Sequence, residues 1–157
     1  MKFVHLSNRL DLNFFMNSEY SDEYARAFAD LFEQRNGKRY FPNDEIEGWS
    51  SLIGSIKNGY DDIDCEYSHD VYCIKEDLDF ITSEKSLDIF EEHSRFKKII
   101  TELDEEFKMV TQVDPRNFPE DATWWQKQIP KIAVKEFWES FSEEDQAILQ
   151  IEIMPES

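Results

Sequence analysis

The chain of 157 residues carries 35 Asp and Glu against 17 Lys and Arg, which gives a formal net charge of −18. Its length predicts a single domain over residues 1–157, because domains most often have roughly 100–150 residues. Aromatic residues make up 15% of the chain, which excludes a disordered acidic tail, since such segments lack the aromatic area that a core requires. So acidic a protein repels phosphate, and direct binding to DNA or RNA is not expected.

The N-terminus and the cysteines indicate the compartment. Residues 1–9 lack the apolar run and cleavage site of a secretory signal, and no apolar stretch approaches the roughly 20 residues that span a bilayer. The acidity also argues against binding to anionic lipid. We therefore predict a cytoplasmic protein without membrane contact, in which Cys65 and Cys73 are reduced thiols.

Two amphipathic helices are predicted in the first third of the chain. Over residues 21–36, Ser21 is a candidate N-cap, apolar residues recur at helical spacing, and Gly37 follows the last turn. A second helix is predicted from about residue 44 to 58, with Asn43 as its candidate N-cap and a glycine after its end.

The middle of the chain contains a segment without helical periodicity, followed by a segment with a long helical stripe. Residues 60–79 show no helical stripe and contain a β-prone run at 71–74. This pattern predicts an acidic, Tyr-rich loop with at most one short strand or hairpin near 63–76. From about residue 86 apolar residues recur at alternating spacings of four and three, which predicts a long central helix, with a coiled-coil seam as the alternative. The stripe consists of Ile89, His93, Phe96, Ile100, Leu103, Phe107 and Val110.

Short elements are predicted after this helix. Pro115 and Pro119 mark a turn, because the residue before a proline is disfavoured in a helix. Short helical segments follow around Trp125 and Phe137, and Ser142 is a candidate N-cap for another. The alternating end of the chain is compatible with a last strand. The whole pattern predicts a mainly α, single-domain multi-helix bundle around the long central helix.

The negative charge is unevenly distributed. Residues 1–40 hold six acids and six bases, whereas residues 44–79 hold eleven acids and two bases. A solvated surface that favours solubility explains such a run most simply. Aromatic residues are interleaved with the acids, however, and aromatic anchors surrounded by carboxylates are typical of surfaces that dock a basic protein. The candidate partner-binding residues are Tyr60, Asp61, Asp62, Asp64, Glu66, Tyr67, Asp70, Tyr72, Glu76, Asp77 and Asp79.

Two metal sites can be considered in this segment. Residues 62–66 begin like an EF-hand loop, but Tyr67 replaces the glycine of the turn and Cys73 replaces the bidentate glutamate. Cys65, His69 and Cys73 have spacings of four, which would align them on a helix, but the segment is predicted to be a loop and a fourth zinc ligand is missing. We expect no metal and no cofactor.

No catalytic motif is recognised in the chain. His5 and His93 are accompanied by no recognisable nucleophile turn, and His93 lies on an apolar stripe, where a hydrogen-bonded core histidine is expected. The few glycines form no phosphate-binding loop. We therefore predict a protein that is not an enzyme, with an uncharacterised enzyme or adaptor as one alternative.

In size, acidity, clustered Asp and Tyr and lack of a catalytic motif, the chain resembles the immunity proteins of contact-dependent growth inhibition and other polymorphic bacterial toxin systems. The resemblance implies one-to-one neutralisation of a cognate toxin, here a nuclease whose basic active site is covered. The main alternative is a nucleic-acid mimic of the anti-restriction type, which would spread its acids along its surface. Adaptation to high salt is disfavoured by eleven lysines against six arginines. A monomer or weak dimer is expected.

Overall fold

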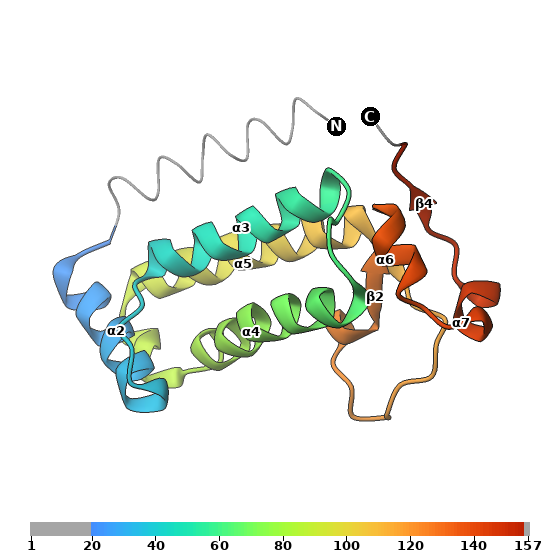
Figure 1. Ribbon diagram of the computed structural model, residues 1–157. Helices are drawn as coiled ribbons and strands as arrows, with labels where there is room; N and C mark the ends of the chain where they lie inside the picture. Colours follow the sequence, from blue (N-terminus) through green and yellow to red (C-terminus); the bar gives the residue numbers. More distant parts are fainter. Residues whose placement is uncertain (1–19, 156–157) are drawn as a thin grey trace. The chain divides into compact units, whose positions relative to one another are not determined.

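The computed structural model describes residues 20–155 and is mainly α-helical (Figure 1), as predicted. His5 lies outside the described residues. The longer helices are α2 (Asp22–Asn36), α3 (Pro42–Lys57), α4 (Asp64–Thr82) and α5 (Glu91–Val110). The short helices are the 3-10 turns η1 (Lys85–Ile89) and η2 (Trp124–Lys127), and α6 (Lys135–Glu139) and α7 (Glu143–Ile148).

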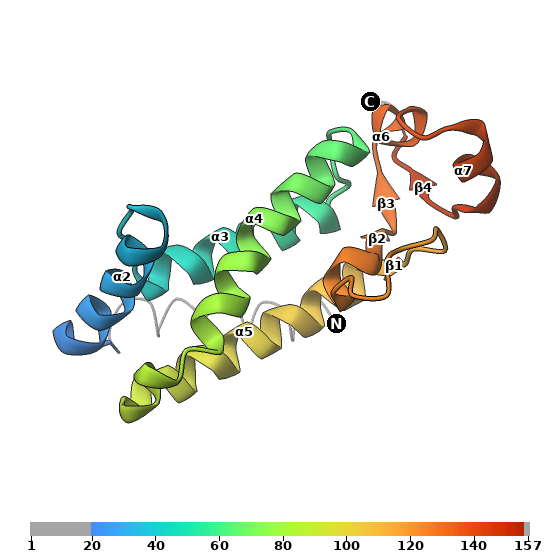
Figure 2. The same ribbon diagram turned by 90° about the horizontal axis from the view of Figure 1, so that it is seen from below.

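Two small strand pairs complete the fold. Strand β1 (Thr111–Val113) pairs antiparallel with β2 (Gln128–Pro130), with Gln112 opposite Ile129. Strand β3 (Ile132–Ala133) pairs in parallel with β4 (Glu152–Ile153), as the alternating C-terminal pattern allowed. Figure 2 shows this second pair together with α6 and α7.

Contacts divide the chain into two compact units, each built from two segments. Unit 1 comprises residues 1–47 and 78–101, and unit 2 comprises residues 48–77 and 102–157. A division by contacts does not decide which parts fold independently, so the single domain stays a prediction.

An aromatic cluster forms the core of unit 1. Helix α2 begins after Ser21, whose hydroxyl accepts a hydrogen bond from the Tyr24 amide, and ends at Gly37 in the left-handed conformation. Phe28 is fully buried and packs edge-on against Phe96 of α5, with 5.1 Å between ring centroids. The predicted caps of this helix are confirmed.

The apolar stripe of α5 is buried. Its members from His93 to Phe107 are at most 3% exposed, so the stripe belongs to the core, as expected of a central helix. Ile89 was predicted to begin this stripe but is 83% exposed. The reason is local: Ile89 ends the 3-10 turn η1, and α5 begins only at Glu91, so Ile89 does not share the helical register.

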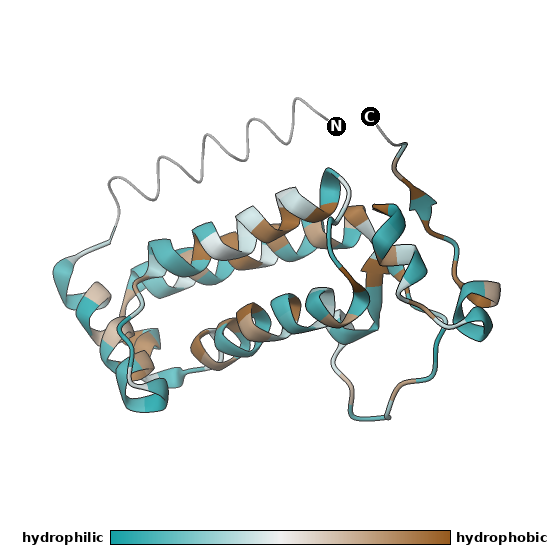
Figure 3. Cartoon of the chain, viewed as in Figure 1, coloured by the Kyte–Doolittle hydropathy of each residue, from teal (hydrophilic) through white to brown (hydrophobic). Residues whose placement is uncertain are grey.

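Helix α4 corrects the prediction of a loop with a short strand or hairpin over residues 60–79. Its buried positions recur at helical spacings of four and three, on one face. Two members of that buried face are a tyrosine and a lysine, so hydropathy alone gives no continuous stripe, and Figure 3 shows hydrophilic and hydrophobic positions mixed along α4. The buried residues of this face are Tyr67, Val71, Lys75, Leu78 and Ile81.

The start of α3 also differs from the prediction. The helix begins at Pro42, so Asn43 lies inside it and is not its N-cap. Proline suits the first helical position because its missing N–H would have no partner there. The Phe41 amide donates to the Asp44 carboxylate at 2.9 Å, which satisfies a backbone group at this end of the helix.

Candidate functional site

Most of the negative charge belongs to one compact unit. Unit 2 contains 21 acidic and 7 basic residues, a net charge of −14, whereas unit 1 contains 14 acidic and 10 basic residues, a net charge of −4. Like charges at this density repel one another, which opposes folding, but they also generate a field that attracts cations. Unit 2 is therefore the part of the chain that attracts a cationic partner most strongly.

Two of the three candidate tyrosines are core residues. Tyr60 and Tyr67 are 3% and 4% exposed, and both pack edge-on against Phe137. Tyr60 donates its hydroxyl to Asp70 at 2.8 Å, and Tyr67 donates to the Gln128 backbone oxygen at 3.0 Å. Burial raises the pKa of both phenols, so they stay neutral. Their expected role as surface anchors is thus corrected, and Asp70 is engaged within the protein.

Asp64 is engaged as well. Arg116 donates to Asp64 at 3.1 Å and to Asp114 at 2.7 Å, while its guanidinium carbon lies 4.8 Å from the centroid of the Phe141 ring. Burial lowers the pKa of Arg116, but the hydrogen bonds to both carboxylates outweigh it, so the net shift is upward. Asp64 is therefore engaged in an ion pair within unit 2.

Three of the candidate acids remain exposed at the start of α4. Asp61, Asp62 and Glu66 are exposed, and together they define the α4 acidic end. Asp62 accepts a hydrogen bond from the next backbone amide but from no cation within residues 20–155. Carboxylates at a helix N-terminus are stabilised by the helix dipole, which offsets part of their mutual repulsion.

The other candidate acids are separated from this group. Glu76 is partly buried and accepts a hydrogen bond from the Tyr72 hydroxyl at 3.3 Å. Asp77 is partly buried in unit 2, whereas Asp79 is exposed but belongs to unit 1. The structure therefore brings together only part of the predicted set.

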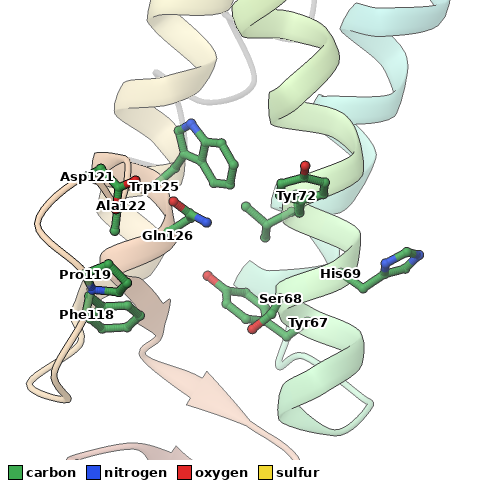
Figure 4. Close-up of a pocket in the computed structure, with 11 residues that line it drawn as sticks. Tyr67, Ser68, His69, Tyr72, Phe118, Pro119, Asp121, Ala122, Trp125 and Gln126 are labelled. Carbon is green, nitrogen blue, oxygen red and sulfur yellow. The ribbon is translucent and has the colours of Figure 1, made fainter. Parts of the chain in front are cut away.

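A pocket of about 500 Å³ opens on unit 2 between α4 and the segment before β2 (Figure 4). Tyr72, the remaining candidate tyrosine, is 48% exposed on one wall, and its ring centroid lies 6.2 Å from that of Trp125 on the other. We call this site the aromatic pocket. Its lining residues are Tyr67, Ser68, His69, Val71, Tyr72, Phe118, Pro119, Asp121, Ala122, Trp125 and Gln126.

The aromatic pocket contains one carboxylate. Asp121 is exposed and makes no hydrogen bond or ion pair with any residue in the described part of the chain. The Gln126 side-chain oxygen accepts from the Thr123 amide at 2.8 Å, which fixes the orientation of its amide group. In Figure 4 the His69 ring points away from the pocket. The pocket thus combines aromatic walls with an unengaged negative charge.

No pattern in the sequence predicted this pocket. Its two walls, residues 67–72 and 118–126, are separated by about 50 residues, and no spacing rule connects them. The second segment is dense in aromatic residues and prolines, a pattern that predicts a turn and a short helix and not a pocket wall. That helix is the 3-10 turn η2, because only residues 124–127 are helical there.

Helix α4 places the thiols and the imidazole of the considered zinc site on its surface. His69 and Cys73 are one turn apart, with 3.5 Å between Nε2 and Sγ. Cys65 and Cys73 are exposed free cysteines. The objection that the segment is a loop no longer holds, but within residues 20–155 no three His, Cys, Asp or Glu side chains are grouped to hold a metal ion.

Lys75, one of the two basic residues in the acidic segment 44–79, is buried. It is 1% exposed, and its Nζ lies 2.8 Å from Asp104 and 5.4 Å from the centroid of the Trp49 ring. The Trp49 indole also donates to Asp104, at 3.0 Å. Because this ammonium group is enclosed, it neutralises little of the exposed charge on α4.

Comparisons of the chain with models of protein families, with curated proteins and with solved structures found no match. Among the helices of residues 20–155, none has the length and apolar character that a bilayer crossing requires.

Proposed function

We propose that this protein is an acidic binding protein that neutralises a cationic protein, and that its partner is a nuclease-type toxin whose active site it covers. The observation that carries the proposal is the concentration of charge: unit 2 holds a net charge of −14 and exposes the α4 acidic end. A field of this kind accelerates association with a basic protein and disfavours partners of the wrong sign.

A nuclease suits this surface because it must attract a polyanion. Its substrate cleft is therefore cationic, and an acidic protein is drawn into the same field. The small net charge of unit 1 favours a focused acidic surface over a nucleic-acid mimic, which would distribute its charges widely. We place the protein in the cytoplasm, where an immunity protein meets an incoming toxin.

The α4 acidic end is proposed to guide the approach. Asp61, Asp62 and Glu66 are exposed, and none forms an ion pair with another described residue. Exposed interface charges act mainly on the association rate and its salt dependence, whereas buried contacts act on dissociation. Asp64 is excluded from this role because it binds Arg116.

The proposal is tested with the C-terminal toxin domain of a secreted protein encoded by the gene adjacent to that of this protein. We expect a basic nuclease domain whose cleavage of DNA or RNA stops at one molar equivalent of the protein. A catalytically inactive toxin should form a one-to-one complex in calorimetry. A neighbouring gene that encodes no such domain, or full nuclease activity at about tenfold molar excess, contradicts the proposal.

A charge-reversal triple locates the surface. Asp61→Lys, Asp62→Lys and Glu66→Lys together should weaken inhibition by about tenfold or more. The matched control places the same charge change on unit 1, through Asp22→Lys, Glu23→Lys and Glu47→Lys, at positions that are also exposed and form no ion pair within the described residues. Equal loss in both triples would show that only net charge matters and would exclude the α4 acidic end as the docking surface.

A further inference from the structure

We propose that the aromatic pocket receives an arginine side chain of the cationic partner. This inference rests on the proposed function and adds a specific contact to it. The pocket lies in the unit that carries most of the negative charge, so an entering group is selected for positive charge before it makes contact.

The walls of the pocket suit a planar cation. Tyr72, which is 48% exposed, supplies the accessible aromatic face, the Trp125 ring lies tilted against it at 59°, and Phe118 and Pro119 extend the apolar lining. A guanidinium group stacks on aromatic faces and is attracted by their electron density, while its apolar stem packs on the remaining wall. A volume of about 500 Å³ accommodates this side chain with adjoining backbone.

Asp121 supplies the charge that an arginine requires. Its carboxylate is exposed at the pocket and, within residues 20–155, has no hydrogen-bond donor or cation of its own. A carboxylate accepts two parallel hydrogen bonds from a guanidinium group, which fixes both position and orientation. A purely apolar side chain would leave this charge without a partner beside it.

Unit 2 already holds one arginine by the same chemistry. Arg116 lies over the Phe141 ring and donates to the carboxylates of Asp114 and Asp64. The aromatic pocket offers the equivalent set of groups, with aromatic rings and a carboxylate, but without the arginine. Lysine is a poorer occupant because its ammonium group is strongly hydrated and not planar.

The test uses hexaarginine and hexalysine peptides as probes of the full chain at low salt. Binding is measured by calorimetry, and the indole N–H signal of Trp125 is followed by NMR. We expect hexaarginine to bind about fivefold or more tightly than hexalysine and to shift the Trp125 signal. Equal affinities, with no shift of that signal, would overturn the proposal.

Two variants and a matched control identify the contacts. Asp121→Asn should weaken hexaarginine binding by about fivefold to tenfold, and Tyr72→Leu should weaken it through loss of an aromatic face. The control Glu120→Gln removes the same charge from the adjacent exposed residue, which does not line the pocket. It should change the affinity by less than about twofold.

The outcomes separate this inference from the proposed function. If hexaarginine binds but Asp121→Asn behaves like Glu120→Gln, the arginine site is overturned and the acidic docking surface stands. If neither peptide binds at low salt, the arginine site and the attraction of cationic partners are both contradicted. If both peptides bind the pocket with equal affinity, the preference for a guanidinium group is wrong.

Discussion

Arg116 makes it possible for unit 2 to bury part of its negative charge. The Asp114 side chain is 2% exposed, and a carboxylate in that position costs several kcal/mol unless it is paired. Arg116 provides the pair and also donates to Asp64, so one cation binds two acids that are far apart in the sequence. At the scale of single residues, internal ion pairs therefore decide which acids are left for a partner.

Replacing Arg116 should be strongly destabilising. Arg116→Met leaves Asp114 buried without its cation, so we expect the free energy of unfolding to fall by about 3 kcal/mol. Urea denaturation followed by circular dichroism measures it. The control Lys135→Met removes an exposed lysine that lies 3.5 Å from Glu139 and should cost less than about 0.5 kcal/mol. Equal losses in the two variants would contradict the role of Arg116 as the cation that stabilises buried Asp114.

His93 should make the stability of the protein depend on pH. It is fully buried, its Nδ1 lies 2.8 Å from the Tyr24 hydroxyl, and burial lowers its pKa from the usual 6.5. Lys97 also lowers this pKa, whereas the carboxylates of Asp88 and Glu84 oppose the shift. The folded chain therefore resists a proton that the unfolded chain accepts. The contribution of neutral, buried His93 to the free energy of unfolding is fully present above about pH 6.5, and it is lost as the pH falls below this value.

Urea denaturation from about pH 7.5 to about pH 5.5 measures this effect. We expect the wild-type free energy of unfolding to decrease over this interval, and the decrease to be smaller in His93→Gln. The control His69→Gln alters an exposed histidine and should retain the wild-type slope. A His93→Gln variant with the wild-type slope would show that burial of His93 does not cause the pH dependence.

At the scale of elements, the predictable helices are those whose signals are local. Helix α2 has a capping serine before it and a glycine after it, and α5 has an apolar stripe. Helix α4 has neither signal in clear form, because Lys75 occupies a buried position of its face and is stabilised there by Asp104 and tryptophan rings. That stabilisation is tertiary, so the sequence pattern could not reveal it.

Proline substitution distinguishes a helix from the predicted loop in this segment. Ser68 is exposed in α4 between buried Tyr67 and the partly buried Asp70. Ser68→Pro should lower the free energy of unfolding by about 3 kcal/mol or more, because it removes a helical hydrogen bond and introduces a clash. Ser68→Ala, the control, should be neutral or slightly stabilising. An unchanged free energy of unfolding in Ser68→Pro would contradict a helix at this position of α4.

The candidate site was predictable only in part. The acids of the α4 acidic end were identified from charge density alone. Tyr67 and Tyr72 are the same residue type in the same acidic segment, yet one is buried and the other half exposed. Their five-residue separation places them on different sides of α4, a distinction that requires knowledge of the helix and its register. The pocket wall at 118–126 required tertiary structure.

At the scale of the whole molecule, the acidity is a property mainly of one unit. Net charges of −14 and −4 on units 2 and 1 mean that self-repulsion acts chiefly within unit 2. Salt screens such repulsion, because the Debye length shortens as ionic strength rises. We therefore expect sodium chloride to raise the free energy of unfolding, measured by urea denaturation.

The charge-reversal triple at the α4 acidic end provides the internal control for this salt effect. Asp61→Lys, Asp62→Lys and Glu66→Lys reduce the repulsion within unit 2, so the stabilisation by salt should be smaller than in the wild-type protein. A wild-type protein that salt destabilises at moderate concentrations would instead indicate that its ion pairs dominate over the repulsion.

Electrostatic docking on unit 2 is best tested by stopped-flow fluorescence, which measures the association rate with the nuclease domain encoded by the adjacent gene as a function of salt. We expect rapid association at low salt and a steep decrease toward physiological ionic strength. The triple at Asp61, Asp62 and Glu66 should associate about tenfold more slowly, with a shallower salt dependence. Identical rates and salt slopes for the wild-type protein, this triple and the unit 1 control triple would contradict electrostatic docking on unit 2.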